Sequence, residues 1–287
     1  MFFIVATQIS VVVGSVLARL ANRLLQSPLK LLVRPLYRLY EGMLWDQVKS
    51  GPLPRHVAII PDGNRRWARE LGMDPIQGHE YGYKKIREVL DILWKLGVKI
   101  VTVYAMSSEN CVKRDPVERD HLFSLIERAI DELESSGELD ARRVRVKVFG
   151  RLDLIPESLA SKIRRIEAKT ERFDGGVLNV ALCYGGREEI LRAVRELARD
   201  AISGRVALDS IDEKTFMSYL YTSHLGELGD PDLVIRTSGE VRISNFLLWQ
   251  IAYSELYFCE VYWPEFRTID LLRAIRDYQR RERRFGA

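Results

Sequence analysis

The sequence predicts an α/β domain built on a single, mostly parallel central sheet of about six strands flanked by helices. Three observations support this prediction: short β-branched apolar runs recur along the chain, they are continuous rather than alternating, and segments with helical periodicity separate them. Continuous apolar runs are typical of strands covered on both faces, and regular alternation of strand and helix favours parallel pairing. The length of 287 residues and the hydrophobic content of 47% suit one large domain or two small ones.

In chain order, the predicted strands are residues 57–60, 99–104, 144–149, 178–183, 233–235 and 256–262. One helix between them has apolar residues at positions 86, 89, 90 and 93, and another has them at 122, 125, 126, 129, 130 and 133. A short Pro/Gly linker at 49–56 precedes the first strand. Residues 51–287 are therefore predicted to form one domain, and residues 1–50 an extension.

The extension differs from the rest of the chain in composition. It has no charge before Arg19, and basic residues then accumulate with no acid before Glu41. A secretory signal is disfavoured because no basic residue precedes the apolar run. Three interpretations remain: a helix lying on a membrane surface, a spanning helix, and a disordered segment or misassigned start. The first suits the segment best, because the run is slightly shorter than the roughly 20 apolar residues of a span and basic residues follow it.

Charge and cysteine usage restrict the function classes. The formal net charge is +4, which is too small to indicate a nucleic-acid-binding protein but suits anionic ligands. Cys111, Cys183 and Cys259 are far apart and form no C-x-x-C pair. The sequence therefore predicts no disulfide and no zinc site, and the cysteines are interpreted as small buried hydrophobic residues in a reducing compartment.

Polar and glycine residues follow the predicted strands, at the carboxyl ends where open parallel sheets bind ligands. These turns are DGNRR at 62–66, SSEN at 107–110, GR at 150–151, YGGR at 184–187 and RTSGEVRIS at 236–244. Arginine forks, hydroxyls and amides at glycine turns bind phosphate oxygens. A carboxylate beside them suits an anionic ligand only if a cation joins the two, so Asp62 indicates Mg²⁺, with Glu255 as a candidate second ligand. The residues thus predict a Mg²⁺-diphosphate site with diphosphate as a leaving group.

Each of these features also has a purely structural interpretation. The tripeptide DGN is usually an ordinary turn, and adjacent arginines usually form a solvated face. His79 is more often a cap or a packed residue, Trp67 more often a packed ring, and Glu255 is equally well a structural partner in its aromatic run. The functional interpretation depends on the recurrence of polar groups at the same end of successive strands.

Five blocks together resemble the cis-prenyltransferases of the undecaprenyl diphosphate synthase type, over about residues 50–287 and in that family's order. The blocks are HVAIIPDGNRRWA, YAMSSEN, NVALCYGGREEI, DLVIRTSGEVRISNFLLWQIAYSELYF and RERRFG. The lead-in PLYRLYEGMLW resembles archaeal members. The sequence contains no adjacent aspartates, which argues against the trans-prenyltransferases and their aspartate-rich metal motif.

The resemblance implies a Z-type polyprenyl diphosphate synthase that condenses isopentenyl diphosphate sequentially with geranylgeranyl or farnesyl diphosphate, and the archaeal lead-in favours the former. It also implies Mg²⁺, a homodimer, a hydrophobic tunnel for the growing chain and a product that serves as precursor of a glycosyl carrier lipid. A cytoplasmic enzyme on the cytoplasmic face of the membrane fits these properties. A non-catalytic partner subunit of the same fold is the alternative, which the acid and arginines of the first turn disfavour. A P-loop nucleotide enzyme has no support, since its motif is absent from the sequence.

The resemblance further implies roles for single residues. Asp62 matches the required, metal-coordinating aspartate, Asn110 a residue that assists proton removal from isopentenyl diphosphate, and Glu255 an acid that reaches the metal within the chain or across the dimer. The residues that match the allylic site and the block behind it are Gly63, Asn64, Arg65, Arg66, Trp67, His79, Ser107, Ser108, Glu109 and Lys113. Those that match the isopentenyl diphosphate site are Arg236, Arg242, Ile243, Ser244, Arg284 and Gly286.

Four positions depart from the bacterial pattern of this family. Pro75 and Lys113 stand where arginines are expected, Cys111 replaces a tryptophan, and Val241 replaces a histidine that can join the metal. Lysine keeps a point charge but loses the bidentate fork of arginine. Arg65 stands where the bacterial turn has glycine, and it is expected to restore part of the charge missing at Pro75.

Overall fold

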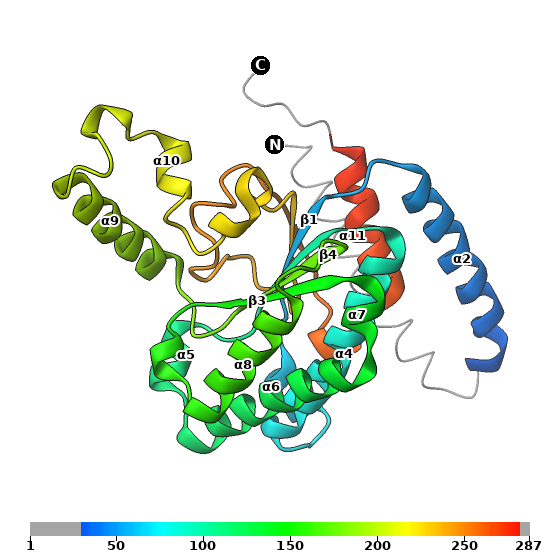
Figure 1. Ribbon diagram of the computed structural model, residues 1–287. Helices are drawn as coiled ribbons and strands as arrows, with labels where there is room; N and C mark the ends of the chain where they lie inside the picture. Colours follow the sequence, from blue (N-terminus) through cyan, green and yellow to red (C-terminus); the bar gives the residue numbers. More distant parts are fainter. Residues whose placement is uncertain (1–29, 282–287) are drawn as a thin grey trace, which may run out of the picture.

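The computed structural model describes residues 30–281, and its centre is a six-stranded sheet (Figure 1). The strands are β1 (His56–Ile60), β2 (Ile100–Tyr104), β3 (Val144–Phe149), β4 (Gly176–Ala181), β5 (Leu233–Arg236) and β6 (Glu255–Phe258). Their order is β3-β4-β2-β1-β5-β6, and every neighbouring pair is parallel. The predicted fold class is confirmed. The fourth strand ends before the predicted position 183, because Cys183 has a φ of 48° and cannot continue a strand.

Ten α-helices surround the strands in the described part of the chain; α2 precedes β1, α11 follows β6, and the others lie between strands in the sequence. They are α2 (Lys30–Ser50), α3 (Asn64–Glu70), α4 (Pro75–Leu96), α5 (Ser108–Lys113), α6 (Pro116–Ser136), α7 (Glu138–Arg142), α8 (Glu157–Thr170), α9 (Gly186–Ile202), α10 (Glu213–Met217) and α11 (Thr268–Arg280). The two predicted periodic helices lie in α4 and α6. Both begin with proline directly after an aspartate N-cap, Asp74 or Asp115, whose side chain accepts backbone N–H groups of the first turn.

The two faces of the sheet carry different layers, because successive side chains of a strand point to opposite faces. Val57, Val101 and Leu178 belong to the larger hydrophobic cluster, which includes residues of α4, α6, α8 and α11. Ala58 and Ala181 belong to a smaller cluster on the other face, with aromatic and leucine residues from the segment that precedes β6. The larger cluster therefore forms between the sheet and its helices.

The domain includes part of the predicted extension. Leu44 and Val48 of α2 are 2% and 0% exposed and belong to the same cluster as α11. The Gln279 side chain of α11 also donates a hydrogen bond of 2.8 Å to the Val48 carbonyl. The helix α2, which was assigned to the extension from the sequence, therefore packs on α11. The apolar segment expected at a membrane lies mostly outside the described residues, and no helix within residues 30–281 is long and apolar enough to cross a membrane.

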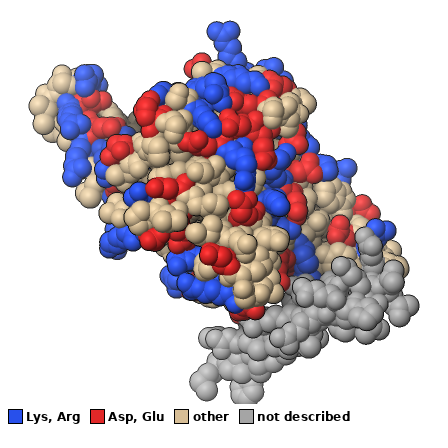
Figure 2. Space-filling model, turned by 90° about the horizontal axis from the view of Figure 1, so that it is seen from below, with Lys and Arg blue, Asp and Glu red and all other residues tan. Residues whose placement is uncertain are grey.

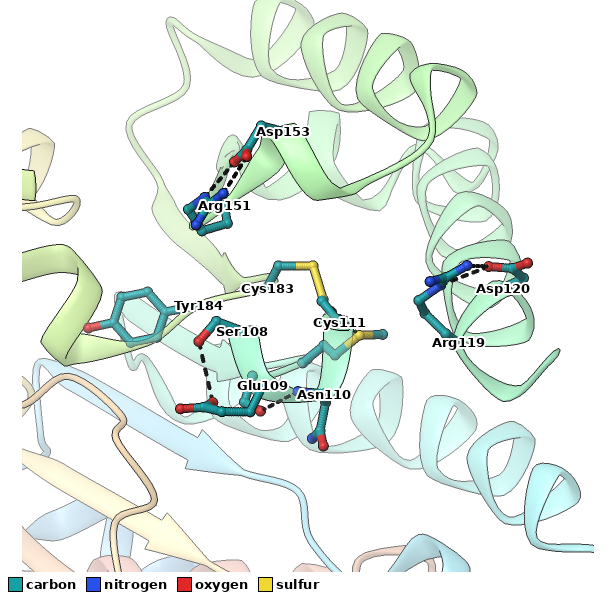
Figure 3. Close-up of a disulfide and its surroundings, with 12 residues drawn as sticks. Ser108, Glu109, Asn110, Cys111, Arg119, Asp120, Arg151, Asp153, Cys183 and Tyr184 are labelled. Atoms are coloured by element: carbon teal, nitrogen blue, oxygen red, sulfur yellow. Dashed lines mark hydrogen bonds and ion pairs between the residues drawn. A yellow bond between two sulfur atoms is a disulfide. The ribbon is translucent and has the colours of Figure 1, made fainter. Parts of the chain in front are cut away.

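A disulfide joins Cys111 in α5 to Cys183 in the turn after β4 (Figure 3). The prediction of unpaired cysteines is wrong at these two positions. The strands β2 and β4 are neighbours, and their pairing continues past their ends as a bridge between Ser107 and Tyr184. This pairing brings the two cysteine Cα atoms within 5.5 Å, although 72 residues separate them in the sequence. Cys259 is the free cysteine.

Basic and acidic side chains lie next to one another on the face of the molecule seen in Figure 2. On the helices, for example, Lys162 and Arg165 of α8 form ion pairs with Asp131 of α6. This mixing of basic and acidic side chains agrees with the small net charge. Binding of a nucleic acid would require a patch of basic side chains, so the mixed charge on this face does not indicate such binding.

Candidate active site

The turn after β1 has a backbone conformation that requires glycine at position 63. Gly63 has a φ of 99°, and a Cβ atom there would lie 2.6 Å from the Tyr262 ring and 2.8 Å from Ser238 Cβ. Only glycine fits this conformation and this space. The turn directs the Asp62 carboxylate toward β5, and the Asp62 amide donates a hydrogen bond of 2.9 Å to Thr237 Oγ1.

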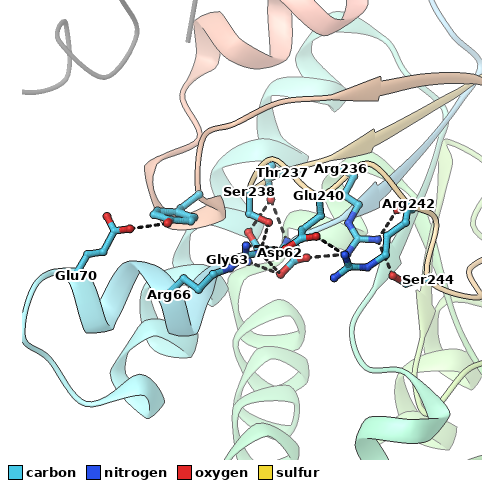
Figure 4. A network of polar contacts seen from close by, with 11 residues as sticks. Asp62, Gly63, Arg66, Glu70, Arg236, Thr237, Ser238, Glu240, Arg242 and Ser244 are labelled. Carbon is cyan, nitrogen blue, oxygen red and sulfur yellow. Dashed lines mark hydrogen bonds and ion pairs between the residues drawn. The ribbon is translucent and has the colours of Figure 1, made fainter. Parts of the chain in front are cut away.

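Asp62 and Arg236 form an ion pair across the ends of adjacent strands (Figure 4). The register places Ile60 opposite Arg236, so the residues that follow β1 reach the guanidinium group. Arg236 Nη2 lies 2.8 Å from Asp62 Oδ2, and Arg66 Nη2 lies 3.4 Å from Oδ1. Burial alone would raise the pKa of Asp62, but the hydrogen bond from Arg236 and the charges of both arginines outweigh it and lower that pKa. The carboxylate is therefore ionised at neutral pH.

We call the polar residues at the carboxyl ends of β1, β2 and β5 the rim. Two acids, Asp62 and Glu240, balance the arginines on the part of the rim after β1 and β5. Arg66 Nη1 lies 2.7 Å from Glu240 Oε1, and Glu240 also forms an ion pair with Arg242. Arg236 Nη1 donates to Ser244 Oγ at 2.7 Å. Glu240 was not among the residues predicted from the sequence. Its place between Arg236 and Arg242, directly after Gly239, could have identified it as part of the site.

The turn after β2 forms the other side of the rim. Ser107 caps α5 by accepting a hydrogen bond of 3.1 Å from the Asn110 amide. Asn245 connects this turn to the segment after β5, because its Nδ2 donates to Glu109 Oε1 at 3.2 Å. Its carbonyl also accepts a hydrogen bond of 2.7 Å from the Gly186 amide at the start of α9. Asn245 is thus a connecting residue that the sequence interpretation missed.

The rim opens into a cavity of about 890 Å³. Its polar end includes Asp62, Arg66, Asn110 and Arg236. The apolar wall formed by the sheet consists of Val103, Val146, Val148, Leu178 and Val180, and the wall formed by α4 and α6 consists of Ile86, Leu90, Leu122, Leu125, Ile126, Ala129, Ile130 and Leu133. The site therefore joins an anion-binding end to a space suited to a hydrocarbon chain.

The structure brings together eleven of the residues predicted from sequence. Those that line the cavity are Asp62, Gly63, Asn64, Arg65, Arg66, His79, Ser107, Glu109, Asn110, Arg236 and Ser244. The others that are described do not line it: Trp67, Ser108, Lys113, Arg242, Ile243 and Glu255. Trp67 is 9% exposed and its ring contacts Tyr81, which supports its interpretation as a packed residue. Arg284 and Gly286 lie outside the described residues.

The departures from the bacterial pattern receive a structural explanation at two positions. Lys113 is exposed, and the next residue, Arg114, lines the cavity instead. A guanidinium group is therefore present at the cavity one residue after the position where the family pattern led us to expect it. Pro75 is the first residue of α4, where its missing N–H is not needed, and it lies outside the cavity lining.

Glu255 does not meet Asp62 within this chain. It is the first residue of β6 and pairs in register with Leu233, at the amino end of β5. Asp62 instead follows Ile60, which pairs with the last residue of β5. The length of a strand separates the two acids, and Glu255 forms an ion pair with Arg281. In the described part of the chain, no group of three His, Cys, Asp or Glu side chains is placed to hold a metal.

The sequence matches a known family over most of its length. The Prenyltransf family model, described as undecaprenyl diphosphate synthase, matches residues 60–286. A tritrans,polycis-undecaprenyl-diphosphate synthase (geranylgeranyl-diphosphate specific) from Methanopyrus kandleri is 52% identical over 266 residues, which cover 93% of this chain and 97% of that protein. A protein with the same description from Thermoplasma volcanium is 53% identical over 249 residues, which cover 87% of this chain and 95% of that protein.

Two solved structures resemble the fold. One is lavandulyl diphosphate synthase from Lavandula x intermedia in complex with dimethylallyl diphosphate, with a TM-score of 0.78, 34% identity and coverage of 82% of this chain and 99% of that one. The other is a probable undecaprenyl diphosphate synthase from Campylobacter jejuni, with a TM-score of 0.65, 30% identity and the same coverage.

Proposed function

Because the chain belongs to the undecaprenyl diphosphate synthase family of cis-prenyltransferases, we propose that it is a Z-type polyprenyl diphosphate synthase that elongates an allylic diphosphate with isopentenyl diphosphate. One observation carries this proposal: the arginine-rich rim opens directly into an apolar cavity. The rim suits two diphosphates, and the cavity suits the growing hydrocarbon chain. A non-catalytic partner subunit is disfavoured, because Asp62, Arg66 and Arg236 are all present and both arginines contact the Asp62 carboxylate.

In each cycle, the bond between allylic carbon C1 and its diphosphate oxygen breaks and the diphosphate leaves with the electron pair. A carbon–carbon bond forms between C1 and isopentenyl diphosphate, which loses a proton to leave a new Z double bond. We assign Asn110 to the place where that proton departs, because it lines the cavity beside Ser107. Arg236 and Ser244 are assigned to isopentenyl diphosphate, and Arg65, Arg66 and His79 to the allylic diphosphate.

Mg²⁺ fits the donor set of the rim. Asp62 offers an ionised carboxylate at the cavity, with its side chain 30% exposed. Mg²⁺ is usually held by one or two carboxylates together with substrate phosphates, so a single aspartate beside a diphosphate pocket is sufficient. When bound, the ion would stabilise negative charge on the leaving diphosphate. EDTA is therefore expected to stop turnover of labelled isopentenyl diphosphate, and added Mg²⁺ to restore it; a metal-independent rate would contradict this role.

Geranylgeranyl diphosphate is proposed as the allylic substrate. The relatives from Methanopyrus kandleri and Thermoplasma volcanium are described as specific for it. The test is to incubate the pure protein with isopentenyl diphosphate and either geranylgeranyl or farnesyl diphosphate, and to size the products. We expect long polyprenyl diphosphates, formed faster from geranylgeranyl diphosphate. A preference for farnesyl diphosphate would contradict the substrate assignment, and no product from either would contradict the proposed function.

A homodimer is proposed on the face that α9 contributes. This helix projects away from the helical layer that contains α4, α6 and α8 (Figure 1). Its side chains Leu191, Val194 and Ile202 are 55%, 48% and 88% exposed. A second copy of the chain would cover them. Because Glu255 does not meet Asp62 within one chain, Glu255 could reach the Asp62 site only from a second copy. Sedimentation of the full chain measures the state, and a monomer at micromolar concentration would contradict it.

A membrane-facing surface is proposed on α2. Leu36, Leu39 and Met43 are 68%, 62% and 63% exposed and recur at helical spacing, so they form one apolar stripe. The stripe is exposed on the described part of the extension, and it suits an enzyme with a lipid product. Changing all three residues to glutamine should reduce binding of the full chain to anionic liposomes without unfolding it, whereas equal binding would contradict the proposal.

A further inference from the structure

A buried carboxylate lies directly behind the rim. Glu118, in the first turn of α6, is 7% exposed and is not part of the cavity lining. Its Oε1 nevertheless contacts three side chains that do line the cavity. The distances from this oxygen are 2.8 Å to His79 Nε2, 3.1 Å to Arg114 Nη1 and 3.5 Å to Arg65 Nε.

The three partners of Glu118 come from three different elements. Arg65 belongs to α3, His79 to α4, and Arg114 is the C-cap of α5. No local turn could bring these side chains together, since they are spread over 50 residues of sequence. One oxygen atom of α6 therefore contacts side chains from all three elements.

The cluster carries more positive than negative charge. Within the described residues, Glu118 is the one carboxylate at ion-pair distance from either Arg65 or Arg114. Burial lowers the pKa of His79, so its ring is uncharged near neutral pH and does not change the charge of the cluster. Two guanidinium groups thus share one carboxylate, whereas on the other part of the rim Arg66 contacts both Asp62 and Glu240.

The unused donors of the cluster suit an anion. Arg65 approaches Glu118 through Nε, so its two Nη groups are available, and its side chain is 43% exposed. Arg114 uses only Nη1 for Glu118 and is 15% exposed. Paired guanidinium groups with free N–H donors bind phosphate oxygens strongly in a partly desolvated site.

We propose that Glu118 is a positioning residue for the allylic diphosphate, and that it acts by holding Arg65 and Arg114 at the cavity with free donors toward the phosphates. This inference rests on the proposed function. It also explains how the rim supplies guanidinium groups although Pro75 provides none. Without the carboxylate, the two arginines would repel each other and lose their common anchor.

The test compares Glu118→Gln with Glu127→Gln in the full chain. Glutamine keeps the size of Glu118 but removes its charge. Glu127 lies on the same helix and is the matched control, because it contacts Lys162 and Ser158 rather than the cavity. Steady-state kinetics give separate KM values for geranylgeranyl diphosphate and isopentenyl diphosphate. We expect Glu118→Gln to raise the allylic KM about tenfold or more, the scale of one lost charge-assisted contact, with less than about twofold change for isopentenyl diphosphate.

The outcomes separate a positioning role from a general structural one. An unchanged allylic KM, or equal rises in both KM values, would overturn the proposal. If Glu118→Gln does not fold, the half-exposed Arg65→Gln takes its place: a rise confined to the allylic KM supports the proposal, and an unchanged KM overturns it. A wild-type protein without activity on any allylic diphosphate would remove the proposed function and this inference together, whereas an active wild type with a normal Glu118→Gln variant would remove the inference alone.

Discussion

Two polar clusters lie in the same sheet and differ in charge and in access. The rim cluster of Asp62, Arg66 and Arg236 is ionic and opens to the cavity. The second cluster is a closed, uncharged network inside the sheet, in which His56 Nε2 lies 2.7 Å from Thr102 Oγ1 and Asn179 Nδ2 donates to the same oxygen at 3.2 Å.

The difference shows which buried polar groups serve chemistry. His56, Thr102 and Asn179 are 1%, 0% and 0% exposed, and their hydrogen bonds end inside the protein, since His224 Nε2 meets Asn179 Oδ1 at 2.9 Å. Such a buried network contributes a unique packing arrangement, and none of these three residues lines the cavity. The rim keeps charge at a cavity, which costs desolvation energy that a ligand or metal can offset.

The comparison is tested most strongly by Asp62→Ala. Loss of the carboxylate should lower turnover of labelled isopentenyl diphosphate at least about 10³-fold, because the proposed metal ligand disappears. The circular dichroism spectrum should stay that of the folded protein, since the Asp62 side chain is partly exposed. Near-normal turnover by this variant would falsify the assignment of the rim as the reactive site. Thr102→Val is the matched control in the closed cluster, and its kcat should equal that of the wild type.

The disulfide between Cys111 and Cys183 stabilises the turn after β2, next to the rim. Cys111→Ala removes a cross-link between residues 72 apart, which should lower the free energy of unfolding by about 2–4 kcal/mol. This variant keeps the charged side chains of the rim and loses only the disulfide next to Asn110. Urea unfolding with and without dithiothreitol measures this effect: the wild-type midpoint should fall on reduction, whereas the variant should be insensitive to it. Equal sensitivity of the two proteins would contradict the role of the bond.

The smallest expected effect is a pH dependence specific to the closed cluster. Burial lowers the pKa of His56 from 6.5 to about 4 in the folded protein. The unfolded chain therefore binds more protons between these values, and stability should fall as the pH decreases from about 6.5 to about 4. For one histidine the loss is at most about 3 kcal/mol. Urea unfolding at several pH values should show a flatter profile for His56→Asn, and parallel profiles would contradict this origin.

Asp62 should contribute in a separate pH window. Its folded-state pKa is lowered from the ordinary value of 3.8, so the stability that its ion pairs provide is present above that value and is lost at more acidic pH. The region of pH 4–6.5 therefore includes the closed cluster together with His79 at the cavity, so the His56→Asn variant is needed to separate the two, and the region below pH 4 includes the rim.

Part of the site was predictable because parallel strands place their carboxyl ends at one edge. Asp62, Ser107 and Arg236 each follow a short apolar run, so their convergence could be predicted before any contact was known. Arg114 and Glu118 could not be identified in this way. Their role depends on how α5 and α6 lie against α3 and α4, and a charged residue in a helix is usually solvated.

Local sequence patterns are sufficient to predict the alternation of strands and helices, the glycine turn at position 63 and the types of polar residue on the rim. These properties follow from local backbone preferences and from side-chain types, which the chain carries at every position. Long-range packing sets the strand order, the pairing of Cys111 with Cys183, the separation of Glu255 from Asp62 and the contact between Arg65 and Glu118. Each of these depends on which distant segments become neighbours, and packing of the whole chain determines that.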